Sequence, residues 1–312
     1  MTPSYLSRLL LLSNASFFVV MMFFGALVAW MTPAAIRRTC AMGPRRAARW
    51  LLTLRLLPAA LSAIVVAGLC VPSYLRFEPH ISNEEAGLVS LSAAILGAAI
   101  CGLAIYRGFT ALLRSTLYLR RAGGRGSIVN GEKVWIVRDG AGLALAGVMR
   151  PRLLISEGAL AGLSSDELAV ALRHEHSHLE SGDNLKRLLI QLAPPVFPGL
   201  RRLEREWVKR AEWAADDEAT GGNPQRSAAL AAALVRVARL QTSAAIPELV
   251  TSLVAADEDL AQRVDRLLEA PALAEAANRR FEAIVFASGA LLIGGLAMNL
   301  RLVHVLLEHF LD

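Results

Sequence analysis

The segment of the sequence with the most chemical potential is 174–178, which reads His-Glu-His-Ser-His. On a helix, residues four positions apart lie on the same face, so the imidazoles of His174 and His178 can bind one metal ion. Glu175 then projects beside that ion, where its carboxylate can take a proton from a bound water. The spacing therefore predicts a metal centre, with Zn²⁺ as the ion, that activates water for attack on a carbonyl group.

The residues around this motif predict the helix that must carry it. Ser164 and Glu167 form a capping box, a pattern that closes the first turn of a helix. Apolar side chains then recur at steps of three and four residues, and the helix is expected to end near Ser181. Asp183 follows directly and is expected to cap a second helix that ends before Pro194.

A catalytic zinc site usually has three protein ligands, so one more ligand must come from elsewhere in the chain. His176 lies two positions from each ligand histidine, and we expect it to contact solvent or substrate instead. The segment 107–280 contains no cysteine, and the remaining histidines lie outside it, so the third ligand should be a carboxylate. On a helix predicted for 200–219, Glu212 and Asp216 lie four residues apart on one face. We predict that Glu212 binds the metal and that Asp216 accepts a hydrogen bond from His174.

The composition indicates a membrane protein. Of the 312 residues, 54% are hydrophobic and only 19% are charged, which excludes a disordered, collagen-like or ordinary soluble chain. A helix needs about 20 apolar residues to cross a bilayer, and four stretches of the sequence meet this requirement. They are 9–31, 53–72, 86–106 and 283–300.

The distribution of arginines predicts the orientation in the membrane. The net charge of +6 could favour nucleic acid, but the basic residues gather beside the apolar stretches, which favours membrane lipids and no direct nucleic-acid contact. The segment 32–52 contains five arginines and no acidic residue. Short segments rich in arginine stay in the cytoplasm, so 32–52 and 107–280 are expected inside. The N-terminus and 301–312 are then expected outside.

The inner segment, 107–280, is long enough to bury a core of its own. Residues 107–121 mix leucines with arginines, as expected for a helix that leaves the membrane and lies along the lipid headgroups. Glycines at 123–126 predict a flexible connection. Short strands are expected within 133–138 and 143–156, where valine, leucine and isoleucine are frequent, with turns at 139–140 and at Gly147.

The strand expected at 148–155 offers a docking place for a peptide. Pro151 has no N–H to donate to a neighbouring strand, so 148–155 is predicted to lie at the edge of the sheet. An exposed edge can take up an extended peptide as an additional strand. The candidate substrate contacts are Val148, Met149, Arg150 and Pro151.

The combined pattern resembles the membrane metallopeptidase part of the BlaR/MecR β-lactam sensor-transducers. The resemblance rests on H-E-x-x-H, then Asp183-Asn184, then Glu-x-x-x-Asp at 212–216, within three spans, an inner segment and a fourth span. It implies zinc ligands at His174, His178 and Glu212, a catalytic base at Glu175, supporting carboxylates at Asp183 and Asp216, and substrate docking along the strand through Pro151. Only 301–312 follow the fourth span, so we expect no extracellular penicillin-binding domain.

These inferences predict a mainly α membrane protein of the bacterial inner membrane. Three transmembrane helices are expected in 1–106, a cytoplasmic α+β gluzincin-like zinc peptidase domain in 107–280, and a fourth transmembrane helix in 281–312. The enzyme would hydrolyse peptide bonds of a cytoplasmic protein, such as a transcriptional repressor. Its expected partners are a sensor protein or a second copy of the chain. Two alternatives stay open: a housekeeping metallopeptidase of the quality-control or prenyl-protein type, and a non-catalytic transducer whose metal organises a helix pair.

Overall fold

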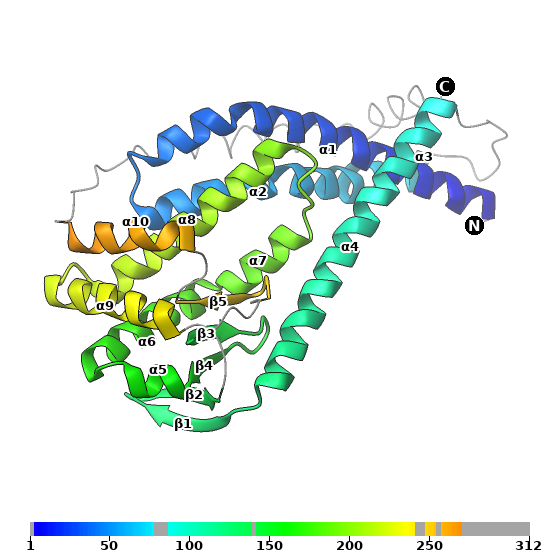
Figure 1. The fold of residues 1–312 in the computed structure, drawn as a ribbon. Helices are drawn as coiled ribbons and strands as arrows, with labels where there is room; N and C mark the ends of the chain where they lie inside the picture. The colour runs from blue at the N-terminus through cyan, green and yellow to red at the C-terminus, as the bar shows by residue number, and fades with distance from the viewer. Residues whose placement is uncertain (1–2, 78–86, 139–141, 241–246, 254–256, 270–312) are drawn as a thin grey trace.

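The computed structural model describes residues 3–77, 87–138, 142–240, 247–253 and 257–269. Within them the chain is mostly helical, and five short strands form one mixed sheet (Figure 1). The first elements are α1 (Pro3–Thr39), α2 (Pro44–Val65), a π-helical turn (Val66–Cys70), α3 (Val71–Phe77) and α4 (Leu88–Ala122). The others are β1 (Arg125–Val129), β2 (Glu132–Val137), β3 (Leu143–Ala146), β4 (Arg152–Ser156), α5 (Glu157–Gly162), α6 (Ser165–Ser181), α7 (Asp183–Gln191), α8 (Pro198–Thr220), α9 (Pro224–Leu240), β5 (Val250–Ser252) and α10 (Asp257–Leu268).

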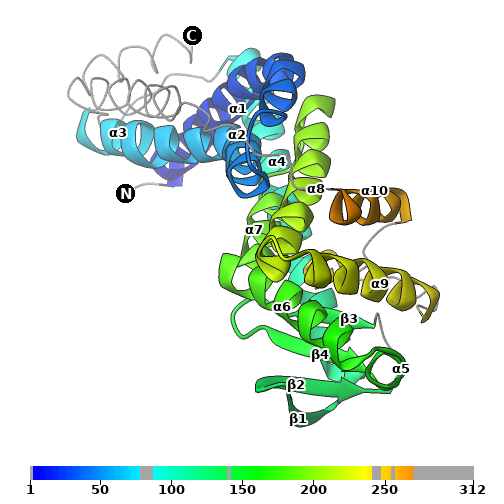
Figure 2. The ribbon, with the colours of Figure 1, turned by 90° about the vertical axis from the view of Figure 1, so that its left-hand side faces the viewer.

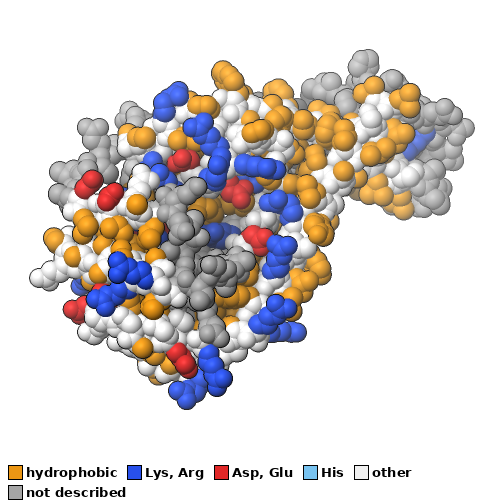
Figure 3. Space-filling model, viewed as in Figure 1, with side chains coloured by type: hydrophobic (Ala, Val, Ile, Leu, Met, Phe, Trp, Pro, Cys, Tyr) orange, Lys and Arg blue, Asp and Glu red, His pale blue; other side chains and the backbone are white. Residues whose placement is uncertain are grey.

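Three of the described helical segments are long and apolar enough to cross a membrane: Tyr5–Thr39, Pro44–Phe77 and Leu88–Ala122. Each has 34 or 35 residues. At about 1.5 Å per residue they measure about 50 Å, more than the hydrocarbon thickness of about 30 Å. The three long apolar helices expected in 1–106 are thus confirmed, while the expected fourth span at 283–300 lies outside the described residues. Figure 3 shows hydrophobic side chains gathering on the arm that these helices form.

The segment 107–121 does not separate from the preceding helix to lie along the headgroups, so that expectation is wrong. It continues α4 without a break. Gly108, a position where a helix can bend, packs closely against the end of α7, since an added methyl group would lie 2.5 Å from Cδ2 of Leu192. The helix ends only at Gly123, whose φ of +60° favours glycine. α4 therefore leads directly from the apolar arm to the sheet (Figure 1).

The sheet has the strand order β1-β2-β4-β3-β5. β1 and β2 form a hairpin whose two connecting residues, Asn130 and Gly131, both have positive φ, as the tightest hairpin turns require. β1 already begins at Arg125, so the flexible connection expected at 123–126 is wrong for its second half. The Asn-Gly pair is the signal that predicts this hairpin, because it marks a turn between two strands.

β4 lies inside the sheet, and the prediction of an edge strand at 148–155 is therefore wrong. It pairs in parallel with β2 and antiparallel with β3. The short strands expected within 143–156 are present as β3 and β4, and the turn expected at Gly147 separates them. Pro151 lies in that turn, before the first residue of β4. Because Pro151 lies outside the strand, its missing N–H does not interrupt the pairing of β4. The edges of the sheet formed by the described strands are β1 and β5.

The two largest apolar cores hold most of the described elements together. The first fills the space between the sheet and helices α5, α6 and α9, which cover one of its faces (Figure 2). The second joins α1 and α2 to α7 and α8, with Leu51 and Trp207 fully enclosed. Arg55 of α2 is buried in this second interface, where Nη2 lies 3.1 Å from Oε2 of Glu204 on α8. Two of the long apolar helices, α1 and α2, therefore share one core with the helix predicted to carry the third ligand.

Candidate metal centre

The helix predicted to carry the motif is present, with both of its predicted ends. The hydroxyl of Ser164 accepts from the N–H of Glu167 at 3.3 Å, and the Glu167 carboxylate accepts from the N–H of Ser164 at 2.8 Å. α6 ends at Gly182, which adopts the left-handed conformation with φ of +69°. Between these ends His174 and His178 stand one turn apart, and both side chains are buried.

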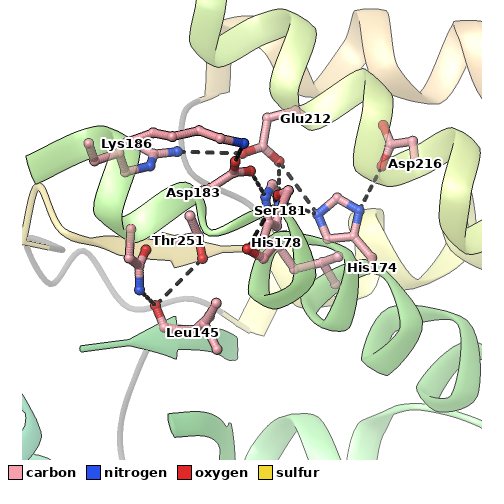
Figure 4. Close-up of polar contacts among 12 residues, drawn as sticks. Leu145, His174, His178, Ser181, Asp183, Lys186, Glu212, Asp216 and Thr251 are labelled. Atoms are coloured by element: carbon pink, nitrogen blue, oxygen red, sulfur yellow. Dashed lines mark hydrogen bonds and ion pairs between the residues drawn. The ribbon is translucent and has the colours of Figure 1, made fainter. Parts of the chain in front are cut away.

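α8 brings a third ligand group to the two histidines, and the three side chains point toward one another in Figure 4. Oε2 of Glu212 lies 3.5 Å from Nε2 of His174 and 3.6 Å from Nε2 of His178, and the two nitrogens are 3.2 Å apart. A point equidistant from these three atoms is about 2.0 Å from each, the usual Zn–N and Zn–O bond length. The predicted His174–His178–Glu212 group is therefore assembled, buried, and of a size that fits one metal ion.

A carboxylate lies next to the Nδ1 atom of each of the two histidines. Oδ1 of Asp216 lies 3.0 Å from Nδ1 of His174, and Oδ2 of Asp183 lies 2.7 Å from Nδ1 of His178. An ionised carboxylate can only accept, so each Nδ1 carries the proton and each Nε2 faces the centre. The expected capping role of Asp183 is wrong, because Gly182 occupies the cap position and the Asp183 side chain turns to the histidine instead.

Arg263 of α10 holds one of these carboxylates in place, and the spacing of the sequence gave no indication of it. Its Nε and Nη2 donate to the two carboxylate oxygens of Asp216 at 3.0 and 2.7 Å. Nη1 donates to the carbonyl of Leu253 at 2.7 Å and lies 3.3 Å from Oε2 of Glu212. The side chain is buried. Arg263 thus fixes Asp216 and, through it, the ring orientation of His174.

α7 supplies two further cations to the site. Lys186 donates from Nζ to Oδ1 of Asp183 at 2.7 Å, and Nη2 of Arg187 lies 3.7 Å from Oε1 of Glu212. Lys186 follows Asp183 by three residues, a spacing at which side chains on a helix meet, so the sequence did contain a signal for this pair. Arg263 is 47 positions from Asp216 and had no such signal.

The charges of this cluster shift the pKa values of its members. Burial lowers the pKa of His178, but the carboxylates of Glu212 and Asp183 outweigh burial and raise it to about 10. Burial likewise lowers the pKa of His174, and the carboxylates of Asp216 and Glu212 raise it overall. Burial raises the pKa of Asp183, but its contact with His178 outweighs this and lowers it to about 2. At neutral pH the metal-free His178 therefore holds a proton that a metal ion must displace.

Glu175 differs from the other acids of the site. Its side chain is fully buried, and neither carboxylate oxygen has a hydrogen-bond partner among the described residues. Burial raises the pKa of this carboxyl group, while the charges of His174 and His178 oppose the rise. Buried polar groups without partners are rare, and a water molecule at the centre would supply one. An acid with a raised pKa is suited to taking up and returning a proton near neutral pH.

The remaining predicted site residues lie apart from this cluster. His176 is partly exposed, with Nδ1 3.6 Å from Glu132 and Nε2 3.3 Å from Glu180. The candidate substrate contacts at 148–151 lie in the turn between β3 and β4. That turn meets the site region through Asn184 of α7, whose Nδ2 donates to the carbonyl of Gly147 at 2.7 Å. Asn184 thereby ties β3 to the helix that carries Asp183.

No protein-family model matches this chain, and a search of curated proteins finds no match either. The resemblance to the BlaR/MecR metallopeptidases therefore stays a prediction from motifs. What the structure defines is a class of site: a buried His-His-Glu group able to bind a metal ion, in a mostly helical protein with three candidate membrane spans among its described residues.

Proposed function

We propose that this chain is a membrane-bound zinc-dependent endopeptidase. The observation that carries the proposal is the buried triangle of His174, His178 and Glu212 beside the unpartnered carboxylate of Glu175. Two histidines and one glutamate are the ligand set of several zinc peptidases, which leave the fourth position open for water or substrate. A purely structural zinc site has four protein ligands, whereas the described residues supply three.

The residues of the site divide the proposed chemistry between them. Zinc, when bound, would lower the pKa of a water molecule and polarise the carbonyl group of the peptide. Glu175 takes the proton of that water on a carboxylate oxygen and later gives it to the departing amide nitrogen. Asp183 accepts from Nδ1–H of His178, and Oδ1 of Asp216 lies 3.0 Å from Nδ1 of His174. These contacts keep both Nε2 atoms directed at the centre. Arg263 keeps Asp216 ionised and in position.

A cytoplasmic protein is the substrate class that we propose. The turn between α1 and α2 belongs to the arginine-rich segment 32–52, which favours the cytoplasmic side of a membrane. Met42 in that turn packs into the same core as α8, the helix of Glu212. The site would then open on the cytoplasmic side, and the resemblance to BlaR/MecR peptidases favours a transcriptional repressor as the substrate.

The test compares the wild-type protein with Glu175→Gln and with a matched control, Glu180→Gln, which makes the same change at an exposed residue of the same helix. Each is expressed in the host membrane, new protein N-termini in the cells are identified by mass spectrometry, and the zinc content of each purified protein is measured. We expect equal zinc in all three, the same new termini for wild type and control, and cleavage slowed by about 10²- to 10⁴-fold for Glu175→Gln.

Equal cleavage by wild type and Glu175→Gln would refute the proposed role of the carboxylate. A protein that binds zinc in stoichiometric amount, but whose presence generates no new termini, would instead use the metal to join α6 to α8. That outcome would favour the non-catalytic transducer over the peptidase.

A further inference from the structure

α7 has the reverse of the polarity that a helix on a water-soluble domain shows. The inward side of its first half carries polar groups: Asp183 contacts His178, Asn184 donates to Leu145 of β3, and Arg187 lies near Glu212. Only towards its end does a buried apolar residue, Ile190, face inward. Helices of soluble domains turn apolar side chains inward and polar ones outward. The metal centre therefore accounts for the polar inner face of α7 but leaves its outer face unexplained.

The outer face of α7 is made of leucines. Leu185, Leu189 and Leu192 recur at steps of four and three residues, so they lie on one side of the helix. Their exposed fractions are 48%, 43% and 42%, and together they form a continuous apolar stripe. Single exposed leucines are common on soluble proteins, but an entire helix face of them marks a surface that meets an apolar phase.

The position of this stripe relative to the candidate spans indicates which phase that is. The chain rises from α7 to α1 before it turns into α8 (Figure 1). In this connection Phe197 packs against Gly25, near the middle of α1, where an added methyl group would lie 2.9 Å from the ring. Leu192 packs against Gly108 of α4 in the same way. The end of α7 is thus continuous with the apolar surfaces of two helices long enough to cross a membrane.

The length of α7 sets the distance between its end, which lies next to α1 and α4, and the metal centre. Its nine residues measure about 13 Å along the helix axis. Arg107 of α4 donates to the side chain of Gln191 at 2.8 Å, so the polar end of α7 is satisfied within the protein. Beyond Arg107, α4 stays apolar on its exposed side, where Phe109, Leu113 and Leu117 lie.

We infer that α7 is embedded in the leaflet nearer the sheet, with Leu185, Leu189 and Leu192 in contact with lipid acyl chains. The metal centre, which α7 contacts through Asp183, then lies at the membrane surface. A polypeptide segment that reaches the centre must approach along that surface.

The experiment measures the surroundings of each leucine directly in the full-length protein. In a background with Cys40→Ser, Cys70→Ala and Cys101→Ala, single changes Leu185→Cys, Leu189→Cys and Leu192→Cys receive a nitroxide spin label. The proteins are reconstituted into vesicles of phosphatidylethanolamine and phosphatidylglycerol. Electron paramagnetic resonance then reports collisions of the label with oxygen, which concentrates in lipid, and with a nickel chelate, which stays in water.

Two positions of matched exposure serve as controls. Leu103→Cys, with 48% exposure in α4, reports a lipid-facing span, and Leu240→Cys, with 46% exposure at the end of α9, reports the sheet-bearing part of the molecule. We expect the ratio of oxygen to nickel collisions at the three α7 positions to match Leu103 and to exceed Leu240 severalfold. An unchanged melting temperature relative to the cysteine-free parent verifies that each labelled protein is folded.

Two results would overturn the inference. Labels reached freely by the nickel chelate would show that the leucine face lies in water. Labels shielded from both reagents would show that protein, either another part of the chain or a second copy, covers it. The readout involves neither metal nor peptide hydrolysis, so it is independent of the proposed enzymatic function.

Discussion

Replacing Arg263 by alanine tests whether the charge network around the centre has the strength that its burial indicates. The change removes both hydrogen bonds to Asp216, the bond to the carbonyl of Leu253, and the positive charge beside Glu212. The Asp216 carboxylate is fully buried, so it loses its strongest partner without gaining water. The matched control is Arg45→Ala, which breaks an exposed pair with Glu218 on the same helix, α8.

The expected magnitudes differ clearly between these two variants. Removing one partner of a buried ion pair costs about 3–5 kcal/mol, because the other charge is left uncompensated. An exposed pair contributes about 0–1 kcal/mol. For a unit of 150–250 residues, 1 kcal/mol corresponds to about 2–4 °C in melting temperature. Arg263→Ala should therefore lower the melting temperature by about 6–20 °C, and Arg45→Ala by at most about 4 °C.

The assay is thermal unfolding of the metal-free full-length protein in detergent, followed by tryptophan fluorescence. A third variant, Asp216→Asn with Arg263→Ala, removes the charge that the single change leaves unpaired and should recover part of the loss. Equal shifts for Arg263→Ala and Arg45→Ala would refute the reasoning. A double variant less stable than Arg263→Ala would show that Asp216 contributes by another route.

Three further predictions follow from the geometry. Asp216→Asn should weaken zinc binding about 10- to 100-fold in competition with a chelator, because His174 loses the anion that orients its ring; unchanged affinity would contradict this. The raised pKa of His178, about 10, means that its protonation stabilises the metal-free protein fully below about pH 6.5 and that this contribution is lost as pH rises through 10. Zinc binding should accordingly release the proton of His178 at pH 7 to 9, measurable by calorimetry in buffers of different ionisation enthalpy, and this contribution should fall to about half at pH 10. Gly97→Ala should destabilise the packing of α1 on α4 by about 1–3 kcal/mol, because the new methyl group would clash with the carbonyl oxygen of Asn14. Gly102→Ala is the control: this position has open space around it, so the change should leave the melting temperature unchanged or raise it.

The ligand triangle was predictable because its information is local. The capping box fixes where α6 begins, and the four-residue step then places His174 and His178 on one face. With cysteine excluded, the same step on the next long helix selects Glu212 and Asp216. Each inference needed only the period of a helix and the ligand preferences of zinc.

The supporting contacts and the sheet order were not predictable in this way, because they depend on segments far apart in the sequence. Arg263 meets Asp216 only after α10 folds back over α8, and a basic residue in a short helix has no distinctive pattern. The sheet order requires β4 to lie between β2 and β3, which a single proline in a turn cannot indicate. β5, with three residues, is too short to show a strand period.

The packing of α2 against α8 determines which pieces of this protein can be handled alone. Leu203 and Trp207 of α8 are covered by residues from the first two helices, and Arg55 neutralises Glu204 in the same contact. A fragment starting at 107, the natural choice for a water-soluble sample, would expose that apolar strip along the helix that carries Glu212. The long apolar helices α1 and α2 therefore also help to position the helix of the candidate metal centre. Purification must keep the two parts together.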